Sequence, residues 1–153
     1  MILETKHFSR MEIEEEKIIE FPHGLVAFED MKRYVLIDNN DGDIPLCWLQ
    51  SLDNPDLAFV VINPFYIIKD YEFEISPADK EELEIENAED VVVFTIVVVP
   101  QEIAKMTTNL AAPLVINAKA RKGKQIVLQN NKYYTRHLLL QNVSEAKTEG
   151  GCS

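Results

Sequence analysis

The stretch that decides the fold is VVVFTIVVV, residues 91–99, which is apolar at every position except Thr95. Its β-branched and aromatic residues favour a strand. A strand without polar alternation is typical of one that is covered on both faces. LAFVVI, residues 57–62, has the same character. We therefore expect these two segments to lie at the centre of a β-sheet.

Shorter β-rich runs surround these two segments. Two of them, Met11–Glu14 and Tyr71–Ile75, alternate apolar and acidic residues, as strands with one wet face do. The others are Ile2–Phe8, Tyr34–Ile37, Leu46–Leu52, Leu114–Ala118 and Gln125–Leu128. Turn-forming residues separate the runs at Asp38–Asp43, Asp53–Asp56 and Arg121–Lys124. This spacing predicts a mainly β protein, a small antiparallel β-barrel or a barrel-like sandwich.

Two or three short helices are expected within this β fold. Ser76 is a typical N-cap, Pro77 suits the first helical position and Asp79 suits the first turn, so a helix should run to about Leu83. A second helix is predicted to begin at Pro100, with residues 103, 106 and 110 on one face. A weaker candidate covers Ala27–Arg33. We expect one domain over residues 1–143 and a flexible tail over 144–153, which has little to bury.

Charge is the unusual feature of the composition. The 153 residues carry a formal net charge of −11. Residues 1–102 hold 24 acids and 7 bases, whereas residues 103–153 hold 2 acids and 8 bases. A strongly acidic chain is a poor binder of RNA, DNA or anionic membranes, because Lys and Arg supply most of that affinity. Neither a secretory signal nor an apolar span long enough for a membrane is visible, so a soluble cytoplasmic protein is expected.

Sites for catalysis, metals or cofactors find little support. The histidines, at positions 7, 23 and 137, show no metal-ligand spacing, and no phosphate-binding glycine loop or nucleophile elbow occurs. Cys47 sits between Leu46 and Trp48 and is better interpreted as a core residue than as a nucleophile. The basic segment Lys119–Lys124 is interpreted as a solvated turn. The sequence thus predicts a protein without enzymatic activity, metal or cofactor.

An acidic belt over residues 70–90 is the most pointed feature. It contains ten acids opposed within the segment only by Lys80. Such a belt is either a solvated face or a surface that speeds encounter with a basic partner. The candidate partner-binding residues are Glu72, Glu74, Glu81, Glu82 and Glu84.

Several separated stretches resemble one known family in their order and spacing. They are FPHGLVAF at 21–28, WLQS at 48–51, DNPDLAF at 53–59, PF at 64–65, NLAAPLVIN at 109–117, and then Arg121, Gly123, Gln125, Tyr133 and Arg136-His137. The family is that of the flagellar assembly factor FliW. One departure is Val26-Ala27, where the family has Pro-Gly. The motif residues that we expect to be mostly structural are Pro22, Gly24, Trp48, Asn109, Pro113, Asn117, Gly123 and Gln125.

The resemblance implies a flagellar assembly factor that binds flagellin and, alternately, the RNA-binding translational repressor CsrA. Binding would antagonise CsrA allosterically and so relieve repression of flagellin translation. The residues add a physical reason, since an acidic body attracts a basic RNA-binding protein. The alternatives are a small β-barrel that binds nucleic acid directly and one that binds a small ligand in its cavity. Val91–Val99, if it were an edge, could also accept a flagellin segment as an added strand.

Overall fold

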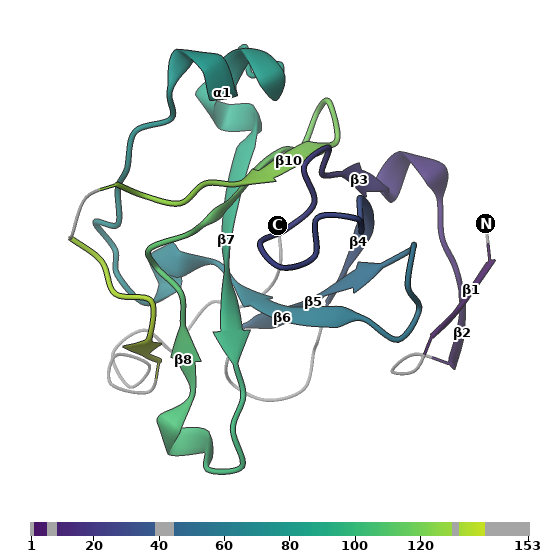
Figure 1. The fold of residues 1–153 in the computed structure, drawn as a ribbon, viewed down its shortest axis with the longest axis horizontal. Coiled ribbons are helices and arrows are strands. Elements are labelled where there is room, and N and C mark those ends of the chain that lie inside the picture. The colour runs from purple at the N-terminus through teal and green to yellow at the C-terminus, as the bar shows by residue number, and fades with distance from the viewer. Residues whose placement is uncertain (1, 6–8, 39–44, 130–131, 140–153) are drawn as a thin grey trace.

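The computed structural model describes residues 2–5, 9–38, 45–129 and 132–139 (Figure 1). Within these ranges the strands are β1 (Ile2–Thr5), β2 (Ser9–Glu12), β3 (Ile19–Glu20), β4 (Arg33–Asp38), β5 (Leu46–Ser51), β6 (Ala58–Ile62), β7 (Val91–Val98), β8 (Thr107–Thr108), β9 (Leu114–Asn117), β10 (Lys122–Gln125) and β11 (His137–Leu138). The α-helix is α1 (Pro77–Glu82), and 3-10 turns lie at Glu15–Lys17, Pro64–Tyr66, Ala88–Asp90 and Ile103–Lys105. The expected turn at Asp38–Asp43 and the tail at 144–153 lie largely or wholly outside the described residues.

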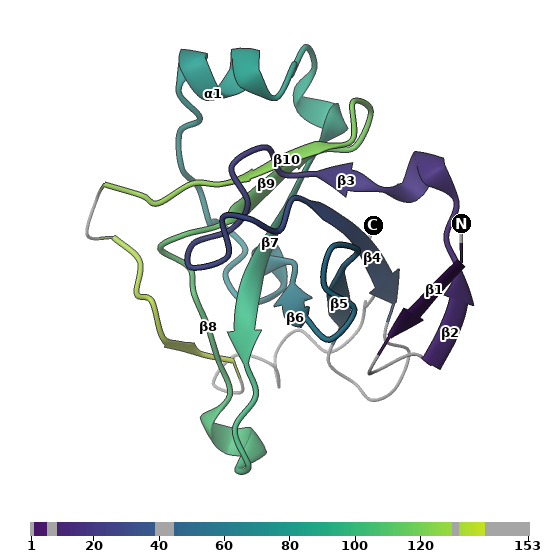
Figure 2. The ribbon, with the colours of Figure 1, turned by 45° about the vertical axis from the view of Figure 1, so that its right-hand side comes forward.

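Seven strands close into a barrel, whose curved wall can be followed in Figure 2. Their order is β7-β6-β5-β4-β3-β10-β9, and β9 pairs with β7 to complete the ring. These pairings are antiparallel except that of β10 with β3, which is parallel at Lys122 and Glu20. β8 and β11 extend from the second half of β7, and β1 and β2 form a separate hairpin. The predicted small β-barrel with few helices is confirmed.

β7 is central because partners occupy both of its edges. Val91–Phe94 pair with β9, residues 95–97 pair with β6, and Val97-Val98 pair with β8. The idea that this strand lies at the edge of the sheet is therefore wrong, although within the described residues Val91–Phe94 have ladder partners only on the β9 side. The buried Thr95 keeps its hydroxyl satisfied by Thr108 at 2.6 Å. This bond explains how one polar residue is tolerated inside an apolar run.

The barrel interior is filled by apolar side chains from every part of the ring. Phe21 and Tyr34 meet edge to face with ring centroids 5.4 Å apart, and both are fully buried. Burial raises the pKa of the Tyr34 hydroxyl to about 12. Gly123 on β10 leaves room for this cluster, because a Cβ there would lie 2.6 Å from the Phe21 ring. The cluster comprises Ile19, Phe21, Leu25, Tyr34, Cys47, Leu49, Val61, Phe94, Leu114 and Ile116.

α1 forms as its capping residues predict. The Ser76 hydroxyl accepts a hydrogen bond from the Asp79 amide at 3.1 Å, Pro77 begins the helix, and Leu83 is its C-cap. Leu83 is fully buried, so the short helix is fixed to the barrel at its C-terminal end. Six residues are too few for a helix to be stable alone, and the burial of Leu83 against the barrel adds the stability that the short helix lacks.

The other two expected helices are wrong. After Pro100 the chain makes only the 3-10 turn Ile103–Lys105 and then forms β8, because Thr108 bonds to Thr95 and to the Ile96 carbonyl. Between residues 27 and 33 the chain makes a bridge of Leu25 with Phe28 and then enters β4. In both places tertiary pairing overrides a local apolar spacing that fits a helix and a turn equally well.

Two predicted strands also differ from the structure. Tyr71–Ile75 keeps the expected alternation of buried and exposed side chains but pairs with no strand of the described chain. The strand expected at 125–128 instead spans Lys122–Gln125, and the tight turn precedes it at residues 118–121. The predicted turn residues at 122–124 therefore belong to the ladder, where β9 is their partner.

Candidate functional site

The segment of residues 71–76 runs from the barrel to α1 and is held firmly at its start. Tyr71 is buried, and its hydroxyl donates a hydrogen bond to the Leu110 carbonyl at 2.6 Å. Its ring packs on Tyr133 with centroids 4.5 Å apart. The Tyr133 hydroxyl in turn accepts a hydrogen bond from the Glu72 amide at 2.9 Å. Burial raises the pKa of Tyr71 well above its usual range, so it remains a neutral donor.

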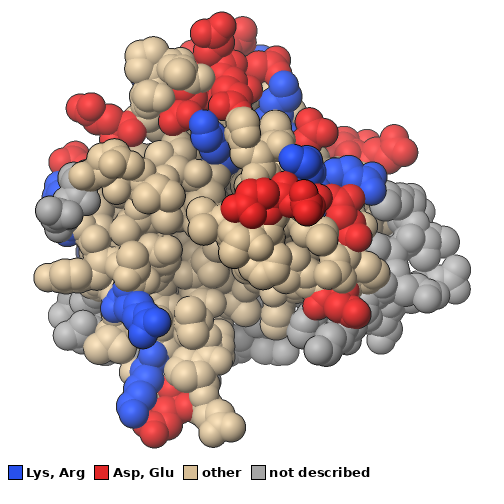
Figure 3. Space-filling model, viewed as in Figure 1, with Lys and Arg blue, Asp and Glu red and all other residues tan. Residues whose placement is uncertain are grey.

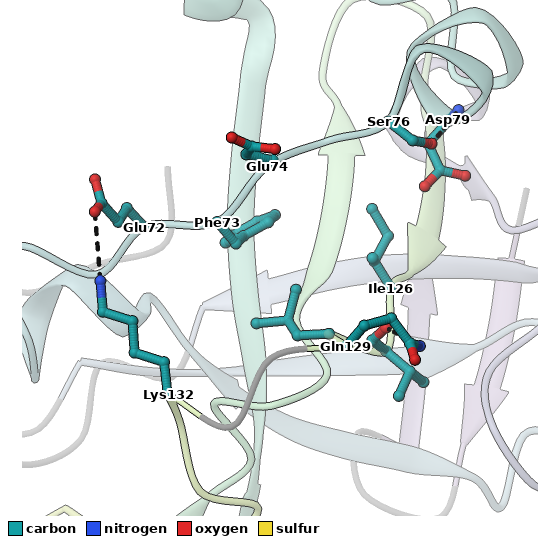
Figure 4. Close-up of a pocket in the computed structure, with 10 residues that line it drawn as sticks. Glu72, Phe73, Glu74, Ser76, Asp79, Ile126, Gln129 and Lys132 are labelled. Carbon is teal, nitrogen blue, oxygen red and sulfur yellow. Dashed lines mark hydrogen bonds and ion pairs between the residues drawn. The ribbon is translucent and has the colours of Figure 1, made fainter.

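A groove of about 790 Å³ lies between this segment and residues 126–129, which follow β10 (Figure 4). Phe73 from one wall and Ile126 from the other point into the space between the two chain segments (Figure 4). The remaining lining residues are Glu72, Glu74, Ser76, Asp79, Val127, Leu128, Gln129 and Lys132. The acids Glu72, Glu74 and Asp79 all lie on one wall, and the opposite wall of residues 126–129 is mostly apolar. Such a combination suits a peptide with both apolar and basic side chains.

Lysines neutralise the acids at both ends of the groove. Lys132 pairs with Glu72 at 3.4 Å at one end. At the other end Lys124 contacts Asp79 at 2.6 Å and Glu82 at 3.1 Å. The hydrogen bonds from Lys124 hold the pKa of both carboxyls below their usual values. His23 also contacts Glu82, so this end is a small ion-pair network.

The hairpin of β9 and β10 supplies most of these lysines. Lys122 pairs with Glu84, and Lys119 lies 4.0 Å from Glu86. The basic segment Lys119–Lys124, interpreted from the sequence as a solvated turn, instead faces the acids of and beyond α1. Figure 3 shows acidic side chains gathered over α1, with basic ones set among them. The acidic belt is thus less negative than its sequence suggests.

The five candidate glutamates fall into two groups. Glu72, Glu82 and Glu84 have lysine partners. Glu74 and Glu81 are exposed and make no ion pair within the described part of the chain. The structure places all five along residues 72–84, but it leaves only these two negative charges unanswered. They are the members of the set that remain available to a basic partner.

Several family-motif residues join the loop of residues 22–28 to the barrel. The side-chain oxygen of Gln125 accepts a hydrogen bond from the Val26 amide at 2.9 Å, and its side-chain nitrogen donates to the Ala112 carbonyl. The Pro22 carbonyl accepts from the Lys32 ammonium at 2.8 Å. Gly24 has φ +66°, and a Cβ there would lie 2.5 Å from the Phe28 carbonyl oxygen. Only glycine fits this crossing.

Ala27 stands where the resembled family has glycine. Its φ of 73° lies in the left-handed region that favours glycine. The Ala27 amide is held by the Glu29 carboxylate at 3.1 Å, and the Phe28 amide donates to the Leu25 carbonyl at 2.7 Å. The loop therefore retains a glycine-type backbone at Ala27 at the cost of some local strain.

Asn117 connects β9 to the end of α1. It is 2% exposed, and its side-chain nitrogen donates to the carbonyls of Leu83 and Glu84 at 2.8 and 3.0 Å. Its side-chain oxygen accepts from the amides of Lys119 and Ala120. All four hydrogen-bonding positions of the amide are used, so this one residue fixes both the helix end and the turn before β10.

The other motif residues lie in or beside the barrel wall. Asn109 accepts from the Ala111 amide at 3.1 Å, and the buried Pro113 offers its carbonyl to the Ile126 amide at 2.9 Å. Trp48 lies on β5 opposite Ile37 and Val60. Its neighbour Cys47 is 1% exposed, as expected of a core residue, and is not a free thiol.

Sequence reasoning missed the groove because its two walls are far apart in the chain. The alternation of Tyr71–Ile75 predicts Phe73 on an apolar strand face, but nothing in the sequence brings Ile126 or Leu128 opposite it. The ion pairs were missed for the same reason, since Lys124 and Asp79 are 45 positions apart. Within the described residues, no three His, Cys, Asp or Glu side chains gather as a metal site would require.

Comparisons with known proteins agree with one another. The family model described as FliW protein matches residues 2–139. A flagellar assembly factor FliW of Alkaliphilus metalliredigens is 47% identical over 97% of this chain and 92% of its own length. One from Caldanaerobacter subterraneus is 42% identical over 95% and 97%. A crystal structure of the flagellar assembly factor FliW superposes with a TM-score of 0.84 at 36% identity, covering 91% of this chain and 96% of that one. This chain belongs to the FliW family of flagellar assembly factors.

Proposed function

We propose that this chain is a non-enzymatic regulator that binds flagellin and, alternately, the translational repressor CsrA. When flagellin is scarce, the free chain captures CsrA and relieves repression of flagellin translation. When flagellin accumulates, it occupies the chain and CsrA returns to the message. Membership in the FliW family supports this proposal, and the observation that carries it is the pair of exposed, unanswered glutamates Glu74 and Glu81.

The exposed carboxylates of this chain would both attract CsrA and weaken the binding of RNA by CsrA. CsrA must carry basic residues to hold RNA, and exposed carboxylates on this chain attract such a surface. Once docked, the same charges repel RNA phosphates nearby, which weakens RNA binding without covering the RNA-binding residues. The chain itself contacts neither nucleic acid nor membrane in this proposal. Within the described residues, no helix has the length and apolar character to cross a membrane.

The place of action follows from the partners. Translation and the supply of flagellin to the export machinery both occur in the cytoplasm, so we place the chain there as well. The structure does not favour the alternative of a small ligand inside the barrel, because apolar side chains fill the interior. Direct RNA binding is tested by filter binding of the chain alone at low salt, where we expect no retained RNA.

The central test titrates CsrA against the double variant Glu74→Gln and Glu81→Gln at two salt concentrations. Removing two unpaired charges should weaken binding about fivefold at low salt and flatten the salt dependence. The matched control is Glu14→Gln with Glu16→Gln, two exposed glutamates near the 3-10 turn Glu15–Lys17. If the variant Glu74→Gln with Glu81→Gln binds CsrA with unchanged affinity and unchanged salt dependence, these two charges do not attract CsrA and the electrostatic proposal is contradicted.

A competition experiment tests the alternation of partners. Flagellin added to a preformed complex with CsrA should release CsrA, measured by size-exclusion chromatography. Addition of the repressed RNA leader should show RNA binding by CsrA restored as flagellin rises. A stable ternary complex of all three proteins with RNA still excluded would contradict the alternating mechanism.

A further inference from the structure

The wall formed by residues 73–75 is strand-like in its side-chain pattern but is not paired with any strand of the described chain. Phe73, Glu74 and Ile75 make no backbone hydrogen bond to any residue of the described chain. Their side chains nevertheless alternate between half-buried and exposed, as those of an extended strand do. An extended backbone with open amides and carbonyls is a template for another strand.

The backbone amides of the opposite wall, residues 126–129, are partly hydrogen-bonded to the chain segment that precedes β9. The amides of Ile126 and Leu128 donate to the carbonyls of Pro113 and Ala111, which continues the pairing of β10 with β9. The Val127 amide makes no such bond within the described residues. The two walls do not pair with each other, and the space of about 790 Å³ separates them. The groove is therefore a gap at which sheet pairing stops.

The two faces of the wall define the chemistry of an added strand. A strand paired to residues 73–75 places alternate side chains beside Phe73, facing the apolar side chain of Ile126 on the opposite wall. The remaining side chains lie beside Glu72 and Glu74. Glu72 already has Lys132, whereas Glu74 has no described ion-pair partner. Opposite charges in directly paired positions stabilise a sheet, so the outward side chains of the occupant should be basic.

The length of the wall sets the length of the occupant. Five residues from 72 to 76 span about 16 Å at roughly 3.3 Å per residue. Beyond Ser76 the chain turns into α1, whose N-cap ends the open edge. At the other end the Glu72 amide is already bonded to the Tyr133 hydroxyl. An occupant of about four to six residues therefore fits between these two stops.

We propose that this groove accepts an extended peptide segment of a partner protein, with alternating apolar and Lys or Arg residues, as a strand added to residues 73–75. The inference deepens the proposed function by giving the partner-binding site a recognition chemistry. It rests on that function only for the identity of the natural partner. Backbone pairing supplies the affinity, and the contacts at Phe73 and Glu74 supply the specificity.

The test uses the full chain and a synthetic probe, the acetylated pentapeptide Lys-Val-Lys-Val-Lys. We expect saturable NMR shifts of the amides of residues 73–75 and slower hydrogen exchange at those amides on binding. Methylation of alternate peptide nitrogens on the pairing side should abolish both effects, because it removes the ladder donors. Equal binding of the methylated peptide, or shifts confined to other surfaces, would overturn the proposal.

Substitutions then separate the two side-chain contributions. Glu74→Lys should weaken the probe about fivefold at low salt, and Phe73→Ala about tenfold. Glu14→Lys makes the same charge change at an exposed site before the 3-10 turn Glu15–Lys17 and should leave the affinity unchanged. A Val-Glu peptide of equal length should not bind. Equal weakening by Glu14→Lys would show a general charge effect and contradict a local site.

The same variants distinguish this proposal from the proposed function. CsrA and flagellin are each titrated against the unmodified chain and against Phe73→Ala. If neither protein binds the unmodified chain, the proposed function is contradicted. The peptide probe still tests, independently, whether the groove accepts an added strand. If both bind and neither is affected by Phe73→Ala, the groove is not their site and the link between the two proposals is refuted.

Discussion

β7 and the segment of residues 71–75 have similar strand-like sequences but opposite fates. In β7 every part of the strand has a neighbour, β9 and β8 on one edge and β6 on the other. The 71–75 segment has the alternation of a strand and no ladder at all. Phe94 of β7 is 1% exposed inside the barrel, whereas Phe73 is only half-buried at the groove.

The difference shows what a local pattern does and does not determine. Alternation and apolar runs decide which side chains turn inward, and both segments obey their patterns. Pairing needs a second strand at the right distance, and that depends on how the whole chain closes. β7 lies inside the closed ring and has a strand partner along its whole length, whereas the 71–75 segment lies outside the ring and has none among the described strands.

The largest contrast should appear in stability. Phe94→Ala removes a ring from the barrel core and should lower the free energy of unfolding by about 3–5 kcal/mol. Phe73→Ala should lower it by about 1 kcal/mol, because Phe73 is half-buried and packs on the outside of the small cluster that contains Tyr71, with the two ring centroids 5.6 Å apart. Urea denaturation of both variants measures the difference. Similar losses would mean that the 71–75 segment is as much a part of the core as β7.

Much of the barrel could be predicted because its signals are local. Leu57–Ile62 is apolar throughout and Val91–Val99 is apolar except at Thr95, so both strands followed from the sequence. Ser76-Pro77 with Asp79 marks the start of the one α-helix. The false helix after Pro100 arose because Ile103, Met106 and Leu110 fit a helical period. That period does not register the Thr95–Thr108 hydrogen bond that draws the chain into β8.

The candidate site was only half predictable for the same physical reason. The acids of residues 72–84 were visible, but their partners Lys122, Lys124 and Lys132 come from the last third of the chain. A count of charges within one sequence segment leaves out lysines from distant segments that pair with its acids in the folded chain. The net charge of a sequence segment therefore overstates the field at a surface when distant lysines fold back onto it.

Asn117 tests how firmly α1 and the groove end are attached to the barrel. Asn117→Leu keeps the approximate volume but leaves the buried Leu83 carbonyl, the partly buried Glu84 carbonyl and two amides without this partner, and should cost about 3 kcal/mol. Asn87→Leu is the control, since Asn87 is exposed and caps nothing with its side chain. Thermal unfolding followed by circular dichroism compares them. Equal melting temperatures would show that the Asn117 node is not what holds α1 to β9.

The ion-pair network of Lys124 with Asp79 and Glu82 of α1 predicts a pH dependence. Because Lys124 lowers the folded pKa of Asp79 and Glu82 below 3.8 and 4.5, their contribution is complete above these ordinary values. It is lost as the pH falls through the lower, folded values. Lys124→Met should therefore reduce stability by about 1 kcal/mol at pH 7 and flatten the loss between about pH 5 and 3.

The control for this pH dependence is Lys80→Met, which removes an exposed lysine of α1 that has no ion pair within the described chain. Urea denaturation at a series of pH values measures both variants. Lys80→Met should keep the acid slope of the unmodified protein. If Lys124→Met keeps that slope as well, the depressed carboxyl pKa values have another source.

Glu74→Gln should have the smallest effect on stability, within about 0.5 kcal/mol, because an exposed charge without a partner holds nothing in place. Glu82→Gln is the matched change on a residue that contacts Lys124 and His23, and it should cost more. Urea denaturation at pH 7 compares the two. A small effect is what the proposal requires, since a charge kept for a partner should contribute little to the stability of the fold. A loss at Glu74 equal to that at Glu82 would assign it a structural role and remove it from the partner surface.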